Sequence, residues 1–449
     1  MNQSTSLVEG SAGKRLISFS APIILANLIQ AIYGIVDMVV VGQYIGSAGM
    51  SAVSMGAQIT TVVLVLANGL SNGGTVLSAQ LFGKGEHKAL PTLVGTLLSF
   101  FALAAVVLTA LLMLLARPLL SAINTPEVAF EQAVAYFLIC MAGTLFVYCY
   151  NGLSAILRGV GNSTAPMVIV IITVILNAAL DLLLVAVIPM GVVGAALATV
   201  FSQFTSLLLT ALYIKKKTQL FDFRPGSWRI NKDFLKLIIK IGLPQSIQFF
   251  FATSSFVLLS GIVNLYGVNP SAAAGAAAKI QSLAHLPAQG VMAGIISLSA
   301  QNLAAGKPKR VMQGLGTGLV FAGLLSLIVC LLCIFFPAQA YRIFTPDEAV
   351  IAAGIDYLKV MSVSFILEGL MFCLFGVITG SGYTPVTMCC GILSAFVVRY
   401  ASAWVLCNIF SMGFLGVAVS YSIGPLPSIA ICLIFILSGK WKTPRVQVR

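Results

Sequence analysis

The chain has 449 residues, of which 59% are hydrophobic and only 8% are charged, so its apolar runs cannot all be hidden inside one soluble core. This excludes a soluble globular protein and indicates an all-α, polytopic membrane protein. The formal net charge of +13 would suggest nucleic acid if the cations clustered in a binding motif, but they are spread over many loops, so no nucleic-acid partner is expected.

Twelve apolar runs are each long enough to cross a bilayer, whose hydrocarbon core takes about 20 helical residues. The loops between them are short, apart from one longer basic linker over 215–234. Nearly all of the nine cysteines fall inside these runs, which favours small buried hydrophobes over disulfides. In chain order the runs are 16–42, 51–76, 91–116, 130–157, 165–187, 192–214, 235–263, 272–298, 311–336, 350–378, 385–408 and 413–438.

The distribution of cations predicts how the spans are oriented. If the N-terminus is cytoplasmic, twenty of the 25 Lys and Arg residues fall on that side, whereas the opposite loops hold only Arg117 and Arg342. Cytoplasmic loops carry an excess of Lys and Arg, so both termini are expected in the cytoplasm. Lys14 and Arg15 lead into a run long enough to span, which indicates an uncleaved first span rather than a signal peptide.

The sequence contains an internal repeat, so that its two halves resemble each other. Sliding the chain against itself by about 221 residues aligns Gly46 with Gly267, and Ser78-Ala79-Gln80 with Ser299-Ala300-Gln301. Each half holds six spans, and an even number returns the chain to its starting side, so the halves are parallel copies related by a pseudo-two-fold axis along the membrane normal. The predicted domains are an N-lobe over 1–214, the linker over 215–234 and a C-lobe over 235–449.

A proline lies a few residues into the first span of each half, at Pro22 and Pro244. Proline removes a backbone hydrogen bond and can bend a helix, which suggests a mechanical role for both residues. The alternative is a proline that is merely tolerated near a helix start.

Two carboxylates lie inside the spans of the N-lobe, Asp37 and Asp181. A charge at the bilayer centre costs about 3 kcal/mol on insertion scales, so each of these carboxylates is expected to have a partner or a function that offsets this cost. Asn177 precedes Asp181 by four residues and shares its helix face, and Thr199 adds a hydroxyl in the next span. These oxygens suit a small hard cation, or the two carboxylates could hold a proton. The alternative is a polar patch that joins helices.

The C-lobe has a different set of charges within its spans. Glu368 is accompanied by Lys279 and Arg399, and an ion pair with either cation would be the least costly arrangement. The pair could equally be purely structural. Three glutamines are candidates for the polar lining of a cavity between spans, namely Gln245, Gln248 and Gln281.

The stretches "PIILANLIQAIYGIVDMVVVGQYIG" and "LRGVGNSTAP", with the Asn177-x-x-x-Asp181 pair and two six-span halves, resemble bacterial multidrug and toxic compound extrusion (MATE) transporters of the NorM/DinF type. The resemblance covers nearly the whole chain. It implies an N-lobe cation site at Asp37, Asn177 and Asp181, with Thr199 a looser match. Members with a C-lobe cation site carry a further acid in span 7, where this chain has Ala252.

The function implied by this resemblance is secondary active efflux. Organic, often cationic and amphipathic compounds would leave in exchange for inward Na⁺ or H⁺, by alternating access in the bacterial cytoplasmic (inner) membrane. The expected partners are small-molecule substrates and membrane lipid, the expected state is a monomer, and neither a cofactor, nor a metal site beyond Na⁺, nor an enzymatic activity is expected. The alternative is a flippase of the same superfamily that moves lipid or lipid-linked oligosaccharide.

Overall fold

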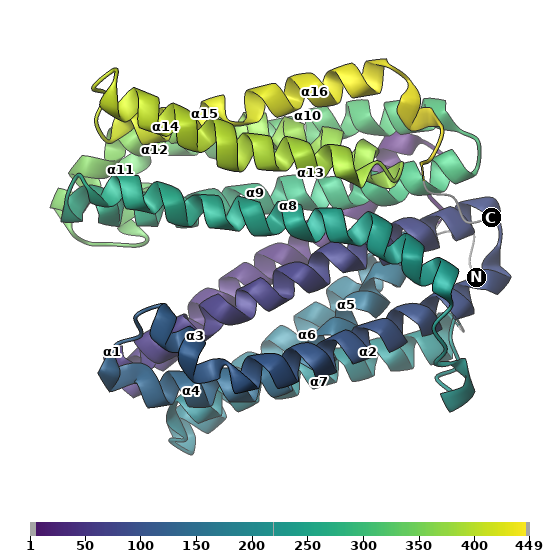
Figure 1. Cartoon of the computed structure of the whole chain (residues 1–449), viewed down its shortest axis with the longest axis horizontal. Coiled ribbons are helices and arrows are strands. Elements are labelled where there is room, and N and C mark those ends of the chain that lie inside the picture. The colour runs from purple at the N-terminus through teal and green to yellow at the C-terminus, as the bar shows by residue number, and fades with distance from the viewer. Residues whose placement is uncertain (1–5, 219, 446–449) are drawn as a thin grey trace. The chain divides into compact units, whose positions relative to one another are not determined.

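A computed structural model describes residues 6–218 and 220–445, and within those ranges the chain is helical with no strand (Figure 1). The predicted all-α class is therefore confirmed. Ten helical segments are long and apolar enough to cross a membrane, and the bent pair α4–α5 makes eleven. Helix α1, Ala12–Lys84, contains the first two predicted spans. Its helical backbone is interrupted between them, at Gly46.

Most other spans are single helices. They are α2 (Leu90–Leu114), α6 (Thr164–Asp181), α7 (Gly191–Tyr213), α8 (Lys232–Asn264), α9 (Val268–Ala304), α10 (Pro308–Phe335) and α12 (Glu348–Gly380). Helices α6 and α7 continue as single π-helical turns, η3 (Leu182–Val187) and η4 (Ile214–Thr218). Short helices α3 (Ala116–Ala122) and α11 (Pro337–Arg342) follow α2 and α10.

Three predicted spans are broken. The fourth consists of α4 (Glu127–Ala142) and α5 (Thr144–Gly159), bent by 44° at Gly143. The eleventh runs through α13 (Thr384–Ile392), the π-helical η6 (Leu393–Val398) and α14 (Arg399–Asn408). The twelfth consists of α15 (Leu415–Ile423) and α16 (Pro425–Leu437), which meet at Gly424. Brief 3-10 turns occur at η2 (His87–Ala89), η5 (Pro225–Ser227) and η7 (Lys440–Lys442).

The repeat predicted from sequence is visible in the backbone. Gly46 and Gly267 have φ of 83° and 100°, and each ends the first span of its half. Residues with a Cβ rarely adopt a positive φ, which explains why glycine occupies both positions. The same geometry recurs at Gly161 and Gly382, which have φ of 88° and 81°.

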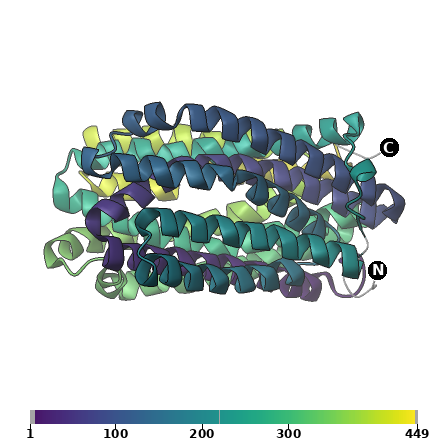
Figure 2. The ribbon, with the colours of Figure 1, turned by 90° about the horizontal axis from the view of Figure 1, so that it is seen from below.

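The described chain divides into two compact units, and within each the helices run side by side (Figures 1 and 2). The first unit spans Leu25–Leu243, and the second contains Ser6–Ile24 together with the chain from Pro244 onward. These units differ from the predicted lobes in one respect. The first turns of α1 belong to the second unit, and residues 232–243 of α8 belong to the first.

Close helix contacts hold these exchanged turns. In the second unit, Gly290 and Gly294 of α9 lie directly against Ile24 and Ser20. In the first unit, a Cβ placed at Gly73 would lie 2.6 Å from the carbonyl oxygen of Ile238. Glycine permits this approach because it has no side chain, as is common where membrane helices cross.

The segment that precedes α1 is also fixed to the second unit. The Arg310 guanidinium donates hydrogen bonds to the carbonyls of Leu7, Glu9 and Gly10, at 3.2, 3.3 and 2.6 Å. The Leu7 amide donates to Gln301 Oε1 at 3.0 Å. Leu7 is buried, so residues 7–10 form a docked strap.

Pro22 and Pro244 both lie inside continuous helices, which shows that neither proline ends its helix. Each also lies beside the point where the chain passes from one unit to the other, between Ile24 and Leu25 and between Leu243 and Pro244.

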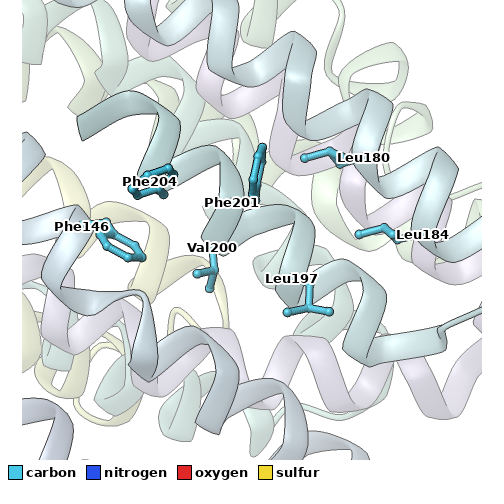
Figure 3. A pocket seen from close by; sticks show the side chains of 7 residues that line it. All are labelled: Phe146, Leu180, Leu184, Leu197, Val200, Phe201 and Phe204. Carbon is cyan, nitrogen blue, oxygen red and sulfur yellow. The ribbon is translucent and has the colours of Figure 1, made fainter. Parts of the chain in front are cut away.

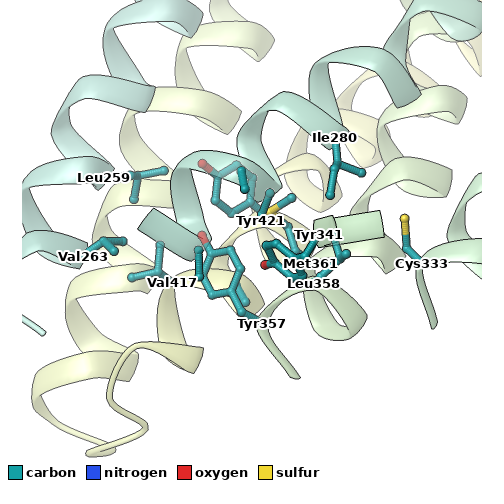
Figure 4. Packing of buried hydrophobic residues seen from close by; sticks show 14 of the residues in the cluster. Leu259, Val263, Ile280, Cys333, Tyr341, Tyr357, Leu358, Met361, Val417 and Tyr421 are labelled. Carbon is teal, nitrogen blue, oxygen red and sulfur yellow. The ribbon is translucent and has the colours of Figure 1, made fainter. Parts of the chain in front are cut away.

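A large apolar core fixes the helices of the second unit (Figure 4). Tyr357 of α12 is fully buried and stacks on Phe414, with ring centroids 4.4 Å apart. Gly354 leaves room for the ring of Tyr341. This core joins α9, α12 and α15, the helices that also position a buried polar cluster described below.

Candidate functional site

The first unit brings together the polar residues predicted in spans 1 and 5. Helix α1 supplies Asp37 and, one turn earlier, Tyr33, while α6 supplies Asn177 and Asp181. The Tyr33 hydroxyl donates to Asp181 Oδ2 at 2.8 Å, and Asn177 Nδ2 lies 3.4 Å from the same oxygen. The side chain of Asp37 faces Asp181 and Tyr33.

The two carboxylates keep acceptor oxygens that nothing in the described structure satisfies. Asp181 is 1% exposed, and its Oδ1 has no hydrogen-bond donor within reach. Asp37 as a whole is half-buried, but its Oδ1 atom is buried and has no hydrogen-bond partner among the described residues. Two buried carboxylates that face each other repel unless a positive charge lies between them. Because the free oxygens are the ligands that hard monovalent cations and protons use, the pair can bind either one.

Two tyrosines at this site were missed in the sequence analysis. Tyr33 precedes Asp37 by four residues, and that spacing alone would have placed both on one helix face. Tyr136 of α4 is 6% exposed, packs against Gly56 and lies close enough to interact electrostatically with Asp37 and Asp181. Its only sequence signal was the repeat, which aligns it with Tyr357.

Thr199 is not joined to the carboxylates. It lies half-buried on α7, a helix that packs against α6, but within the described residues its hydroxyl makes no hydrogen bond to Asp37, Asn177 or Asp181. Its place in an ion site stays a prediction.

An apolar cavity of about 330 Å³ lies between α5, α7 and the end of α6 with η3. Phe146 of α5, Leu184 of η3 and Phe201 of α7 point into it, and no polar side chain lines it (Figure 3). The remaining lining residues are Leu180, Leu197, Val200 and Phe204. Such a surface can hold an alkyl or aromatic group but no ion.

The second unit contains the Glu368 cluster, formed by Glu368, Arg399, His285, Gln281 and Tyr421. Arg399 Nη2 donates to Glu368 Oε1 at 2.5 Å. His285 Nε2 contacts Glu368 Oε2, and Gln281 Nε2 lies 3.4 Å from that oxygen. The Arg399 guanidinium also lies 4.6 Å from the centre of the Tyr421 ring. Both oxygens of Glu368 are therefore satisfied, unlike those of the N-lobe aspartates.

Of the two cations considered for Glu368, the structure brings only Arg399 to it. Lys279 is exposed on α9 and makes no ion pair with Glu368 in the described chain. The reason is helical geometry, because Lys279 precedes Gln281 by two residues and so points to nearly the opposite side of α9. The contact of His285 with Glu368 was not predicted, because nothing in the local sequence of His285 indicates a partner on another helix.

The three glutamines are buried in packing contacts. Gln245 Nε2 donates to Thr379 Oγ1 at 2.8 Å, and Gln248 packs against Gly391. Gln281 belongs to the Glu368 cluster. All nine cysteines are free thiols, as the sequence analysis expected.

Comparison with known proteins places these features in context. The sequence model of the MatE family matches residues 22–183 and again 244–405, one match in each half. The chain is 28% identical over 445 residues to the probable multidrug resistance protein YpnP of Bacillus subtilis (strain 168), covering 98% of each. It is also 28% identical over 445 residues to the probable multidrug resistance protein NorM of Thermotoga maritima, covering 97% of this chain and 94% of that one.

A solved structure has the same fold. It is the outward-facing conformation of a multidrug resistance MATE family transporter of the MOP superfamily, with a TM-score of 0.92 and 20% sequence identity. The match covers 98% of this chain and 99% of that chain.

Proposed function

The chain belongs to the MATE family of multidrug transporters, and from this premise we propose that it exports organic, often cationic and amphipathic compounds in exchange for inward Na⁺ or H⁺. The observation that supports coupling most directly is the carboxylate pair Asp37–Asp181, with two buried oxygens that have no hydrogen-bond partner in the described part of the chain. An ion is the ligand that this pair needs, since an unneutralised pair would be costly in the membrane.

The coupling ion acts by changing which conformation is favoured. Asp37 lies on α1 and Asp181 on α6, so an ion bound to both holds these two helices together. The ion shifts the equilibrium between outward- and inward-open states only because it binds one of them better. One charge moving down 100 mV releases about 2.3 kcal/mol, and a tenfold ion gradient adds about 1.4 kcal/mol, which is sufficient to drive export.

Coupling is assigned to the N-lobe alone. The positions corresponding to Asp37 and Asp181 in the repeat are Leu258 and Ala403, which cannot bind an ion. Glu368 is neutralised by Arg399, so we assign it a structural ion pair. Pro22 lies close to the passage of α1 between units, and we propose that bending there moves Asp37 relative to Asp181.

The protein is proposed to work as a monomer in the bacterial cytoplasmic membrane, with both termini in the cytoplasm and without an enzymatic activity or cofactor. The apolar cavity on α7 suits the hydrophobic part of a substrate or lipid. The relatives bear the names of multidrug resistance proteins, which does not favour the flippase alternative.

The test is transport by purified protein in liposomes under an imposed Na⁺ or pH gradient, with a fluorescent cationic dye as substrate. Asp37→Asn and Asp181→Asn keep the side-chain volume and remove the charge, so both variants should fold but lose gradient-driven transport. Asp356→Asn, at an exposed aspartate on α12, is the matched control and should transport normally. Wild-type rates in either site variant would show that these carboxylates only join helices.

A further inference from the structure

The part of the linker that follows residue 219 is a folded segment that packs on α2. Phe221 is 2% exposed and contacts the rings of Phe223 and Trp228, with centroids 4.9 and 6.3 Å away. The Ser227 carbonyl lies against Gly95 of α2, in a position that a side chain there would occupy. Side chains of the linker are therefore presented in a defined arrangement.

Hydrogen bonds to α2 complete this docking. The buried Thr96 hydroxyl accepts from the Asn231 amide at 3.0 Å, donates to the Thr92 carbonyl of its own helix at 2.7 Å and lies 3.4 Å from the Arg229 carbonyl. Asn231 Oδ1 in turn accepts from the amides of Asp233 and Phe234, both at 3.0 Å, and caps helix α8. The linker is thus held against α2 from Phe221 to Asn231.

The docked linker carries an excess of unneutralised positive charge. Its cations are Lys215, Lys216, Lys217, Arg224, Arg229 and Lys232, and all six are exposed. Of these, only Arg224 has an ion-pair partner in the described structure, Asp222, at 3.7 Å. Hydrogen bonds from the Ser227 side chain and the Arg224 amide lower the pKa of Asp222, which keeps that carboxylate charged. Among the described residues, the other five cations form no ion pair.

Apolar side chains are exposed among these charges. Trp228 is 39% exposed and Ile230 is 41% exposed, on either side of Arg229. The linker joins two membrane spans directly, and exposed apolar residues continue on both, as at Leu212 on α7 and Ile239 on α8. Tryptophan beside Lys and Arg at the end of a span is the composition of a membrane-interface anchor.

We propose that the linker is a binding site for the headgroup of an anionic phospholipid, with Trp228 and Ile230 contacting its upper acyl chain. The positive-inside rule explains why cations are present on this side, but it requires only their number. It does not require that three of them, Arg224, Arg229 and Lys232, lie on or next to a docked loop that also exposes apolar side chains. Anionic lipid satisfies both features, because it supplies a phosphate and hydrocarbon at the same depth.

Trp228 gives a direct probe of this contact. The chain has three tryptophans, so Trp404→Phe with Trp441→Phe leaves Trp228 as the sole tryptophan, whose fluorescence can be excited selectively. We would reconstitute this protein in mixed vesicles in which either phosphatidylglycerol or phosphatidylcholine is brominated near the headgroup, at equal mole fractions. Brominated phosphatidylglycerol should quench Trp228 more strongly. Equal quenching by both lipids, or none by either, would overturn the proposal.

Charge removal supplies the matched comparison. Lys215→Gln, Lys216→Gln and Lys217→Gln together should weaken the selective quenching, by about fivefold in lipid affinity per lysine. The control removes the same charge at exposed lysines elsewhere, Lys309→Gln, Lys440→Gln and Lys442→Gln, and should keep the selectivity. An equal loss in both triple variants would show that only net charge matters and would refute a site at the linker.

A soluble anion distinguishes a bilayer lipid from a free anionic ligand. Inorganic phosphate or polyglutamate at matched ionic strength should displace no more lipid than sodium chloride does. Stronger displacement by either would assign the surface to a soluble anion instead. These experiments measure lipid contact rather than transport, so their outcome is independent of the proposed ion coupling.

Discussion

Replacing Glu368 by Gln should destabilise the second unit strongly. The side chains of Arg399 and Glu368 are 5% and 3% exposed, so the substitution leaves a buried guanidinium without its counter-ion. Breaking a buried pair in this way costs about 3–5 kcal/mol, because the remaining charge is neither solvated nor paired.

Double variants identify the partner. Glu368→Gln with Arg399→Gln removes both charges and should recover much of the lost stability, whereas Glu368→Gln with Lys279→Gln should be as unstable as the single variant, because Lys279 is exposed. Thermal melting of the purified proteins in one detergent gives the order of stabilities. The reasoning is refuted if the Arg399 double variant melts no higher than Glu368→Gln, or if the Lys279 double variant recovers.

Three other outcomes are expected. Gly159→Ala should lower the free energy of unfolding by about 1–3 kcal/mol, because its Cβ would lie 2.6 Å from the Thr75 carbonyl oxygen. The control Gly316→Ala places its Cβ in open space and should not lower the melting temperature in this way. Equal melting temperatures of the two variants would contradict the reasoning. Arg310→Gln should accelerate hydrogen exchange at the Leu7 amide while Lys309→Gln should not, and unchanged exchange in both would show that Arg310 does not hold the strap. In a cysteine-free background, single cysteines of a first group, placed in loops assigned to the outside, should react with an impermeant maleimide added outside. Those of a second group, placed in loops assigned to the cytoplasm, should not react; the reverse pattern would invert the assigned orientation. The first group is Ser47→Cys, Glu127→Cys and Asn269→Cys, and the second is Glu86→Cys, Thr218→Cys and Lys309→Cys.

The spans could be predicted from sequence because their signal is local. A run of about 20 apolar residues has few alternatives to a membrane helix, so run length sufficed for all twelve. The breaks at Gly143 and Gly424 could not be predicted in the same way. A glycine inside a span is compatible with a straight helix, and only contacts with neighbouring helices decide whether the backbone bends there.

The two polar sites differed in how many of their residue contacts could be predicted from the sequence. Asn177 and Asp181 share a helix turn, so their spacing was enough to place them together, and the same rule applied to Tyr33 and Asp37 would have found the tyrosine. His285 and Glu368 come from helices far apart in the chain. Their contact depends on how α9 packs against α12, which no local pattern encodes.

The exchange of first turns between the units has a consequence for the order of biosynthesis. Residues 6–24 leave the ribosome long before the α9 glycines against which they pack. The first unit can be completed once residues 232–243 emerge, whereas the second must wait with an unpacked N-terminal segment until α9 and α10 are inserted. A chain cut within the linker would therefore yield two fragments that each lack a piece of their own unit, and neither should mature without the other present in the same membrane.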